Sequence, residues 1–111
     1  AGQYAEQALK KLGVWEKIQS KIVFAKDVRT VLTYVDTGNV DAGLVYKTDA
    51  AVSKKVKILA TAPDGSHAPI IYPAAVLTGT KNQKAAEEFL SYLAGPEGKS
   101  VFEKHGFVMG K

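Results

Sequence analysis

Three positions in the sequence bring groups that could hold an anion. One helix is predicted to begin at Ala1 and Gly2, and another at Asp27 and Val28. The first backbone N–H groups of a helix have no partner within it and carry a partial positive charge, so they bind anions. Tyr46 ends a predicted strand, and its hydroxyl is a neutral hydrogen-bond donor. In α/β folds, ligands bind beyond the carboxyl ends of the strands, where such groups would meet.

A tetrahedral oxyanion can be held by these groups without a cationic side chain. Many fixed dipoles then share the charge, and a protein that must release its cargo avoids tight ion pairing. The pattern alone is not specific, because every α/β domain has helix starts. A tyrosine at the end of a strand is also more often a core residue than a ligand-binding one.

Catalytic signatures are missing from the sequence. His67 lies in a predicted turn and His105 at a predicted helix end, far apart and without the partners of a catalytic triad. The pair Glu87 and Glu88 falls on the exposed face of a helix, and residues 78–81 lack the spacing of a phosphate-binding loop. The absence of cysteine excludes disulfides, thiolate zinc sites and cysteine nucleophiles.

Composition indicates one globular domain. The chain has 111 residues, of which 46% are hydrophobic and 23% are charged. This balance is ordinary for a folded domain with one modest core. The net charge of +4 comes from scattered lysines rather than a clustered basic stripe, so we do not expect nucleic-acid binding.

Helical periodicity and capping signals predict six helices. Apolar residues recur at three and four positions, and each segment is bounded by a capping residue, a glycine or a proline. The predicted helices cover residues 3–12, 15–18, 28–37, 49–53 (capped by Thr48 or Asp49), 82–94 and 96–105.

Short apolar runs predict strands between these helices. The runs cover residues 22–25, 41–46 and 56–61, and a longer stretch at 68–78 is interrupted by Pro73. Alternating strands and helices favour an α/β layered fold with a mostly parallel sheet. Three or four strands are few for such a sheet. We therefore expect that an N-terminal part, with its signal sequence, precedes Ala1.

Several segments of the chain resemble the periplasmic molybdate-binding proteins. The resemblance extends over the whole chain with the spacing between segments preserved. Its segments are AGQYA at residues 1–5, DVR at 27–29, GLVYKTDA at 43–50, YPAAV at 72–76, FLSYL at 89–93, GP at 95–96 and KHGF at 104–107.

This resemblance implies a three-layer, two-lobed binding protein of the type II class, with an oxyanion between the lobes. Matched to the family, the second-lobe donors would be the backbone N–H groups of Ala1 and Val28 and the hydroxyl of Tyr46. Serine or threonine hydroxyls of the first lobe would complete the site. The ligand would be molybdate or tungstate, with no cofactor and no metal other than that of the oxyanion. The partner would be the membrane permease of an ABC importer.

The resemblance also implies a division of the chain. Residues 1–71 would belong to the second lobe, residues 72–78 would be a strand crossing at the hinge, and residues 79–111 would return to the first lobe. The protein would be periplasmic or extracytoplasmic, and lipid-anchored in a Gram-positive source. Because half-covered apolar faces would remain, we expect the chain alone to self-associate or to exchange segments.

Two other classes of protein share this architecture. Effector-binding domains of transcription regulators use the same two-lobed fold, but they need a DNA-binding helix-turn-helix upstream. An enzyme on an α/β scaffold would need a nucleophile and a base, and we find no such pair. The chain is therefore not expected to be an enzyme, although fold alone does not separate these classes.

Overall fold

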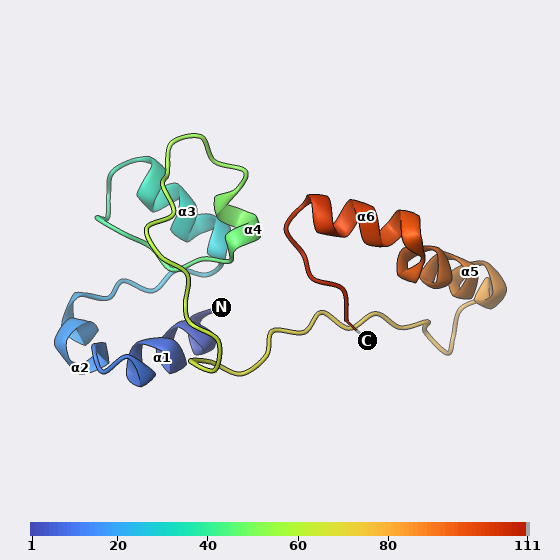
Figure 1. The fold of residues 1–111 in the computed structure, drawn as a ribbon, viewed down its shortest axis with the longest axis horizontal. Helices are drawn as coiled ribbons and strands as arrows, with labels where there is room; N and C mark the ends of the chain where they lie inside the picture. Colours follow the sequence, from blue (N-terminus) through green and yellow to red (C-terminus); the bar gives the residue numbers. More distant parts are fainter. Residues whose placement is uncertain (111) are drawn as a thin grey trace. The chain divides into compact units, whose positions relative to one another are not determined.

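The computed structural model describes residues 1–110, which form helices joined by irregular segments (Figure 1). The chain divides into two compact units, Ala1–Pro69 and a second that begins at Ile70. The first unit contains α1 (Gly2–Lys11), α2 (Trp15–Ile18), the 3₁₀ helix η1 (Gln19–Lys21), α3 (Val28–Asp36) and α4 (Lys47–Ala50). The second contains α5 (Gln83–Ala94) and α6 (Pro96–Lys104).

Local capping signals account for most helix boundaries. The carboxylate of Asp27 accepts a hydrogen bond from the Thr30 N–H at 2.7 Å, so Asp27 caps α3 as predicted. Gly13 and Gly38 follow α1 and α3 with φ of 73° and 74°, a left-handed conformation that glycine adopts without strain. Pro96 is in the first turn of α6, where its missing N–H costs nothing. These predicted boundaries are confirmed.

Polar and aromatic contacts tie α1 to a distant loop of its unit. The side-chain oxygen of Gln7 accepts a hydrogen bond from the Ala68 N–H at 2.8 Å. The rings of Tyr4 and His67 meet edge to face with centroids 5.9 Å apart. The adjoining turn is closed by Ser66, which donates to the Pro63 carbonyl at 2.6 Å. These contacts, together with the packing of the face that carries the buried Ala8, hold α1 in place.

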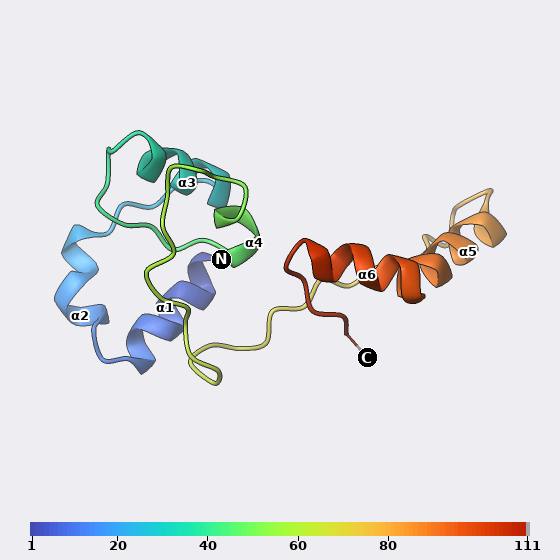
Figure 2. The ribbon, with the colours of Figure 1, turned by 45° about the horizontal axis from the view of Figure 1, so that its top comes forward.

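Close backbone packing joins α3 to the segment that leads into α4. A Cβ placed on Gly43 would lie 2.8 Å from Cγ1 of Val31 and 2.9 Å from Cγ2 of Val35. Only a glycine can bring residues 42–46 this close to the apolar stripe of α3. Figures 1 and 2 show α3 and α4 side by side, with α4 following directly from this segment.

The second unit is a pair of packed helices followed by a short tail. The backbone of Gly98 on α6 lies against the Leu93 carbonyl of α5, a contact that leaves no room for a side chain. A hydrogen bond from Tyr92 to Glu97 also joins the pair and raises the pKa of the tyrosine above 10.0. In the tail, the ring of Phe107 packs edge to face on Phe102, with centroids 6.0 Å apart.

The predicted strands are not confirmed. Among residues 1–110 the structure contains no strand, and the four segments predicted as strands are irregular. A strand needs a neighbouring strand to pair its N–H and C=O groups, and no such pairing forms within the described residues. These segments leave large apolar side chains exposed, by between 63% and 78%: Val23, Phe24, Leu59, Ile71, Tyr72 and Leu77. The α/β layering is therefore not established by this structure.

One predicted helix is misplaced. We expected residues 49–53 to be helical, with a cap at Thr48 or Asp49, whereas α4 begins at Lys47 with Tyr46 as its cap. The helix starts earlier than predicted because Asp49 is engaged in a contact with another helix. Its carboxylate pairs with a residue of α3 and does not cap its own helix.

Candidate oxyanion-binding site

The start of α3 presents a backbone donor at Val28. Val28 is the first residue of the helix, so its N–H has no partner within the helix. The N–H and the hydroxyl of Thr30 both donate to Asp27, at 2.7 and 2.8 Å. These two bonds lower the pKa of Asp27 below its ordinary value of 3.8, and the bond from the N–H has the larger effect. The capping carboxylate thus occupies the Thr30 N–H, while the N–H of Val28 stands two residues earlier, at the very start of the helix.

The start of α4 is formed by Tyr46. Its backbone is extended, with φ −71° and ψ 147°. Its carbonyl accepts hydrogen bonds from the N–H groups of Asp49 and Ala50, at 3.0 and 3.1 Å. Tyr46 therefore begins a helical turn instead of closing a strand, and its side chain is half-buried. The predicted hydroxyl donor and the predicted N–H donor at Val28 both lie at helix starts.

Two polar contacts join α3 and α4 in parallel. Near their starts, Nε of Arg29 lies 2.8 Å from Oδ1 of the buried Asp49. Near their ends, the hydroxyl of Ser53 donates to Oδ1 of Asp36 at 2.7 Å. Residues early in α3 therefore pair with α4 itself, and the last residue of α3 pairs with a residue just after α4. The two helices run in the same direction, with Val28 and Tyr46 at the same end.

Ala1 is the cap of α1. Its carbonyl accepts a hydrogen bond from the Ala5 N–H at 2.9 Å, and the residue is exposed. The structure thus places Val28 and Tyr46 at the starts of two helices, α3 and α4, that contact each other. The third predicted donor, Ala1, lies at the start of α1.

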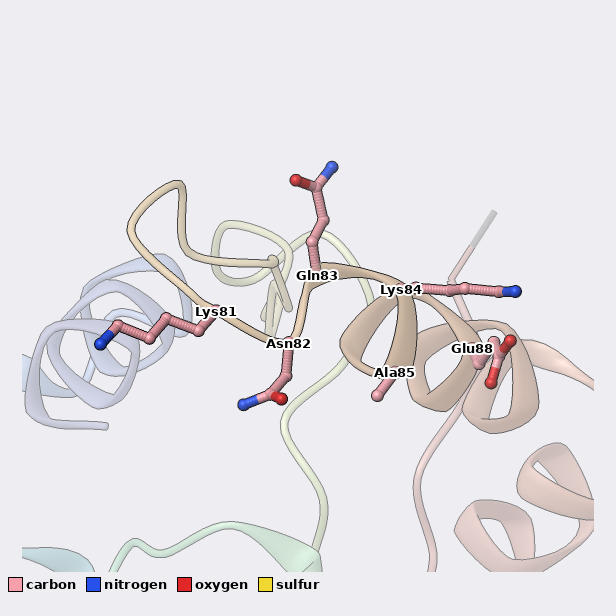
Figure 3. Close-up of a pocket in the computed structure, with 6 residues that line it drawn as sticks. All are labelled: Lys81, Asn82, Gln83, Lys84, Ala85 and Glu88. Carbon is pink, nitrogen blue, oxygen red and sulfur yellow. The ribbon is translucent and has the colours of Figure 1, made fainter.

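A separate hollow of about 470 Å³ lies at the start of α5. Figure 3 shows that the side chains of Lys81, Gln83 and Lys84 point away from one another, and that Asn82 points to yet another side. Ala85 and Glu88 complete its lining. A site for a small ligand needs polar groups that converge on one point. This hollow lacks that convergence, so it is not a candidate binding site.

The histidines are held by nearby carbonyl groups. Nδ1 of His67 lies 2.8 Å from the Ala68 oxygen, and Nδ1 of His105 lies 2.9 Å from the Val101 oxygen. Within residues 1–110, no three His, Cys, Asp or Glu side chains gather in a way that could hold a metal ion. In the same range, no helix has both the length and the apolar character needed to cross a membrane.

Comparison with known proteins identifies the family. Residues 1–108 match the family described as bacterial extracellular solute-binding protein. The chain belongs to this family. The resemblance found in the sequence is thereby confirmed at the level of the family.

Relatives over nearly the whole chain carry names that agree with this family. The Bacillus subtilis (strain 168) lipoprotein YvgL, whose name assigns it to substrate binding for an ABC transporter, is 55% identical over 97% of this chain. The molybdate-binding protein ModA of Escherichia coli (strain K12) is 41% identical over 98% of the chain. ModA of Haemophilus influenzae is 42% identical over 96%. The chain spans 42% of the length of each of these three relatives.

Four residues that join α3 to α4 and the segment after it were missed from sequence. Arg29 and Asp49 are 20 positions apart in the sequence, and Asp36 and Ser53 are 17 apart. No local sequence pattern therefore predicts either contact. Gly43 did carry a signal, because a glycine inside an apolar run often marks a close backbone approach.

Proposed function

We propose that this chain forms the second lobe, and the C-terminal segment of the first lobe, of an extracytoplasmic solute-binding protein that carries molybdate or tungstate to an ABC importer. The observation that carries the proposal is the 41–42% identity, over nearly the whole chain, to two proteins named molybdate-binding. Joined to first-lobe segments, the chain would complete a layered α/β fold. We call that longer protein the two-lobed receptor.

The division of the chain follows from this proposal. Residues 1–71 belong to the second lobe, residues 72–78 cross at the hinge, and residues 79–111 return to the first lobe. The exposed apolar side chains of residues 22–25, 56–61 and 71–77 would then be covered by neighbouring strands and helices. The permease of the importer is the partner, and the protein works outside the cytoplasm, periplasmic or lipid-anchored.

The proposed binding mechanism uses neutral donors. The N–H groups of Val28 and Ala1 and the hydroxyl of Tyr46 donate to the oxygens of the dianion, and hydroxyls of the first lobe supply the rest. Each hydrogen bond to a charged group contributes roughly 1.5–3 kcal/mol, so a handful of them suffices for micromolar affinity, about 8 kcal/mol. No covalent step occurs, and the oxyanion is released unchanged.

Electrostatics near these donors fit a site that selects by geometry. Arg29, the nearest cation in sequence to Val28, is already paired with Asp49, and the carboxylate of Asp27 caps the same helix. The Arg29 guanidinium is therefore already occupied by a carboxylate, and oriented N–H and O–H groups are left to bind the anion. Such a site favours the oxyanion whose oxygens fit the donor positions over other dianions.

The test is the thermal stability of the two-lobed receptor with different oxyanions. A ligand at 100 times its Kd stabilises the folded state by about 2.7 kcal/mol. We expect micromolar molybdate or tungstate to raise the melting temperature by several degrees, and equal concentrations of phosphate to change it little. A receptor that responds equally to phosphate, or that does not respond to molybdate, would exclude the proposed ligand.

A further inference from the structure

The ion pair between Arg29 and Asp49 lies beside the two proposed donors. Arg29 is next to Val28 in the first turn of α3, and Asp49 is three residues after Tyr46 in α4. Their side chains meet at 2.8 Å, with the Asp49 carboxylate about 10% exposed and the Arg29 side chain 62% exposed. The pair is thus the direct link between the start of one helix and the start of the other.

The stability of α4 depends on contacts outside the helix. It has four residues, far fewer than a helix needs to persist without tertiary contacts. Asp49 is the buried residue of α4, and it is held by the guanidinium of Arg29. The placement of α4, and of Tyr46 at its start, therefore depends in part on an ion pair whose other member belongs to α3.

We propose that Arg29 and Asp49 are positioning residues, which set the distance and angle between the Val28 N–H and the Tyr46 hydroxyl. This inference rests on the proposed oxyanion site and adds to it. A hydrogen bond weakens steeply when its donor is misaligned, so a small rotation of α4 against α3 would lose one donor without unfolding the lobe. The pair also keeps the Arg29 guanidinium bound to Asp49. The guanidinium is then not available to bind anions of any shape at the site.

The contact between Asp36 and Ser53 provides a matched control. It joins the last residue of α3 to the segment just after α4 at 2.7 Å, away from the helix starts at Val28 and Tyr46. Removing it with Ser53→Ala should lower the stability of the helix pair and leave the donors aligned. A general loss of packing would therefore affect both contacts, while a positioning role belongs to Arg29 and Asp49 alone.

The experiment is a calorimetric titration of the two-lobed receptor with molybdate, using Asp49→Ala, Arg29→Gln, the double variant and Ser53→Ala. The first two break one ion pair but change the net charge in opposite directions. We expect each to weaken binding roughly tenfold, the effect of losing one charge-assisted hydrogen bond. The double variant should bind no more weakly than the single variants, because both remove the same interaction. Ser53→Ala should remain within about twofold of the wild type.

Other results would overturn the positioning role. If Asp49→Ala tightened binding while Arg29→Gln weakened it, only net charge would matter. Equal losses in Ser53→Ala would assign the effect to general packing, and unchanged affinity in both charge variants would remove the pair from the site. If Asp49→Ala fails to fold, Arg29→Gln still tests the positioning role, because it breaks the same ion pair at a more exposed position. A wild-type receptor that binds no molybdate would refute the proposed function itself, and the positioning role with it.

Discussion

The backbone of Gly43 lies so close to Val31 that a Cβ there would be 2.8 Å from the valine Cγ1. Real Cβ atoms do not approach other heavy atoms this closely, and a β-branched valine in a helix has little freedom to move aside. The residue before Leu44 must therefore be glycine for residues 42–46 to pass along α3. This contact holds the segment that leads into Tyr46 and α4 against α3.

Replacing Gly43 by alanine should destabilise the second lobe. Overpacking of a fitted contact costs about 1–3 kcal/mol, because either the valines or the backbone must shift. Chemical denaturation of the two-lobed receptor measures the change. Gly79→Ala is the control, since nothing lies within 4 Å of a Cβ at that position. Equal stability of the two variants would show that residues 42–46 do not pack on α3 in this way.

Replacing Tyr46 by phenylalanine should weaken molybdate binding and leave the fold intact. The change removes one hydroxyl donor to a charged ligand, worth roughly 1.5–3 kcal/mol, or about 10- to 150-fold in Kd. Calorimetric titration gives the value. Tyr34→Phe removes a hydroxyl from the same pair of helices, towards the far end of α3, and should bind as the wild type does. If Tyr46→Phe keeps the wild-type affinity, the hydroxyl does not contact the oxyanion.

The cap at Asp27 predicts a dependence of stability on pH. Its pKa is lowered in the folded state, chiefly by the Thr30 N–H, so folding favours the ionised carboxylate. That stabilisation is present above the unfolded value of 3.8 and disappears as the pH falls through the lower folded value.

The melting temperatures of the wild type and Asp27→Asn, compared between pH 7 and pH 3, measure this contribution. The wild type should be the more stable at neutral pH, and the difference should shrink below the ordinary carboxyl pKa of 3.8. A difference that stays constant over this range would mean that the charge of Asp27 contributes nothing to the cap.

Capping residues made the helices predictable, because a cap acts on groups within one turn of itself. Asp27 with Thr30, Gly38 after α3 and Pro96 at the start of α6 each fix a boundary through local geometry. The family resemblance was equally accessible, since it depends on runs such as residues 43–50. These features need no knowledge of what the rest of the chain does.

Long-range contacts could not be predicted in this way. An apolar run such as residues 22–25 becomes a strand only if another strand pairs with it, and within residues 1–110 none does. The start of α4 was misplaced because Asp49 looks like a helix cap in sequence, yet it pairs with Arg29 in space. The sequence therefore pointed to Val28 and Tyr46 as donors, which stays a prediction, but it gave no sign of the ion pair between their helices.

The exposed apolar side chains predict that the 111-residue chain associates when it is alone. Phe24, Leu59 and Leu77 are 77–78% exposed, and each lies in a segment with the composition of a buried strand. Burying such surface stabilises an assembly by roughly 25 cal/mol for each Å² removed from water. Light scattering across a concentration series should give a dimer or larger species. A monomer with cooperative unfolding at all concentrations would contradict this.

The most direct measurement of the central claim is the backbone amide signal of Val28 in a ¹⁵N-labelled two-lobed receptor titrated with molybdate. If the oxyanion accepts a hydrogen bond from the start of α3, the Val28 proton resonance moves downfield and saturates at one equivalent. The Val101 amide, within α6, serves as the internal reference and should not move. Saturable binding that leaves the Val28 signal in place would contradict the account, because the oxyanion would then lie elsewhere.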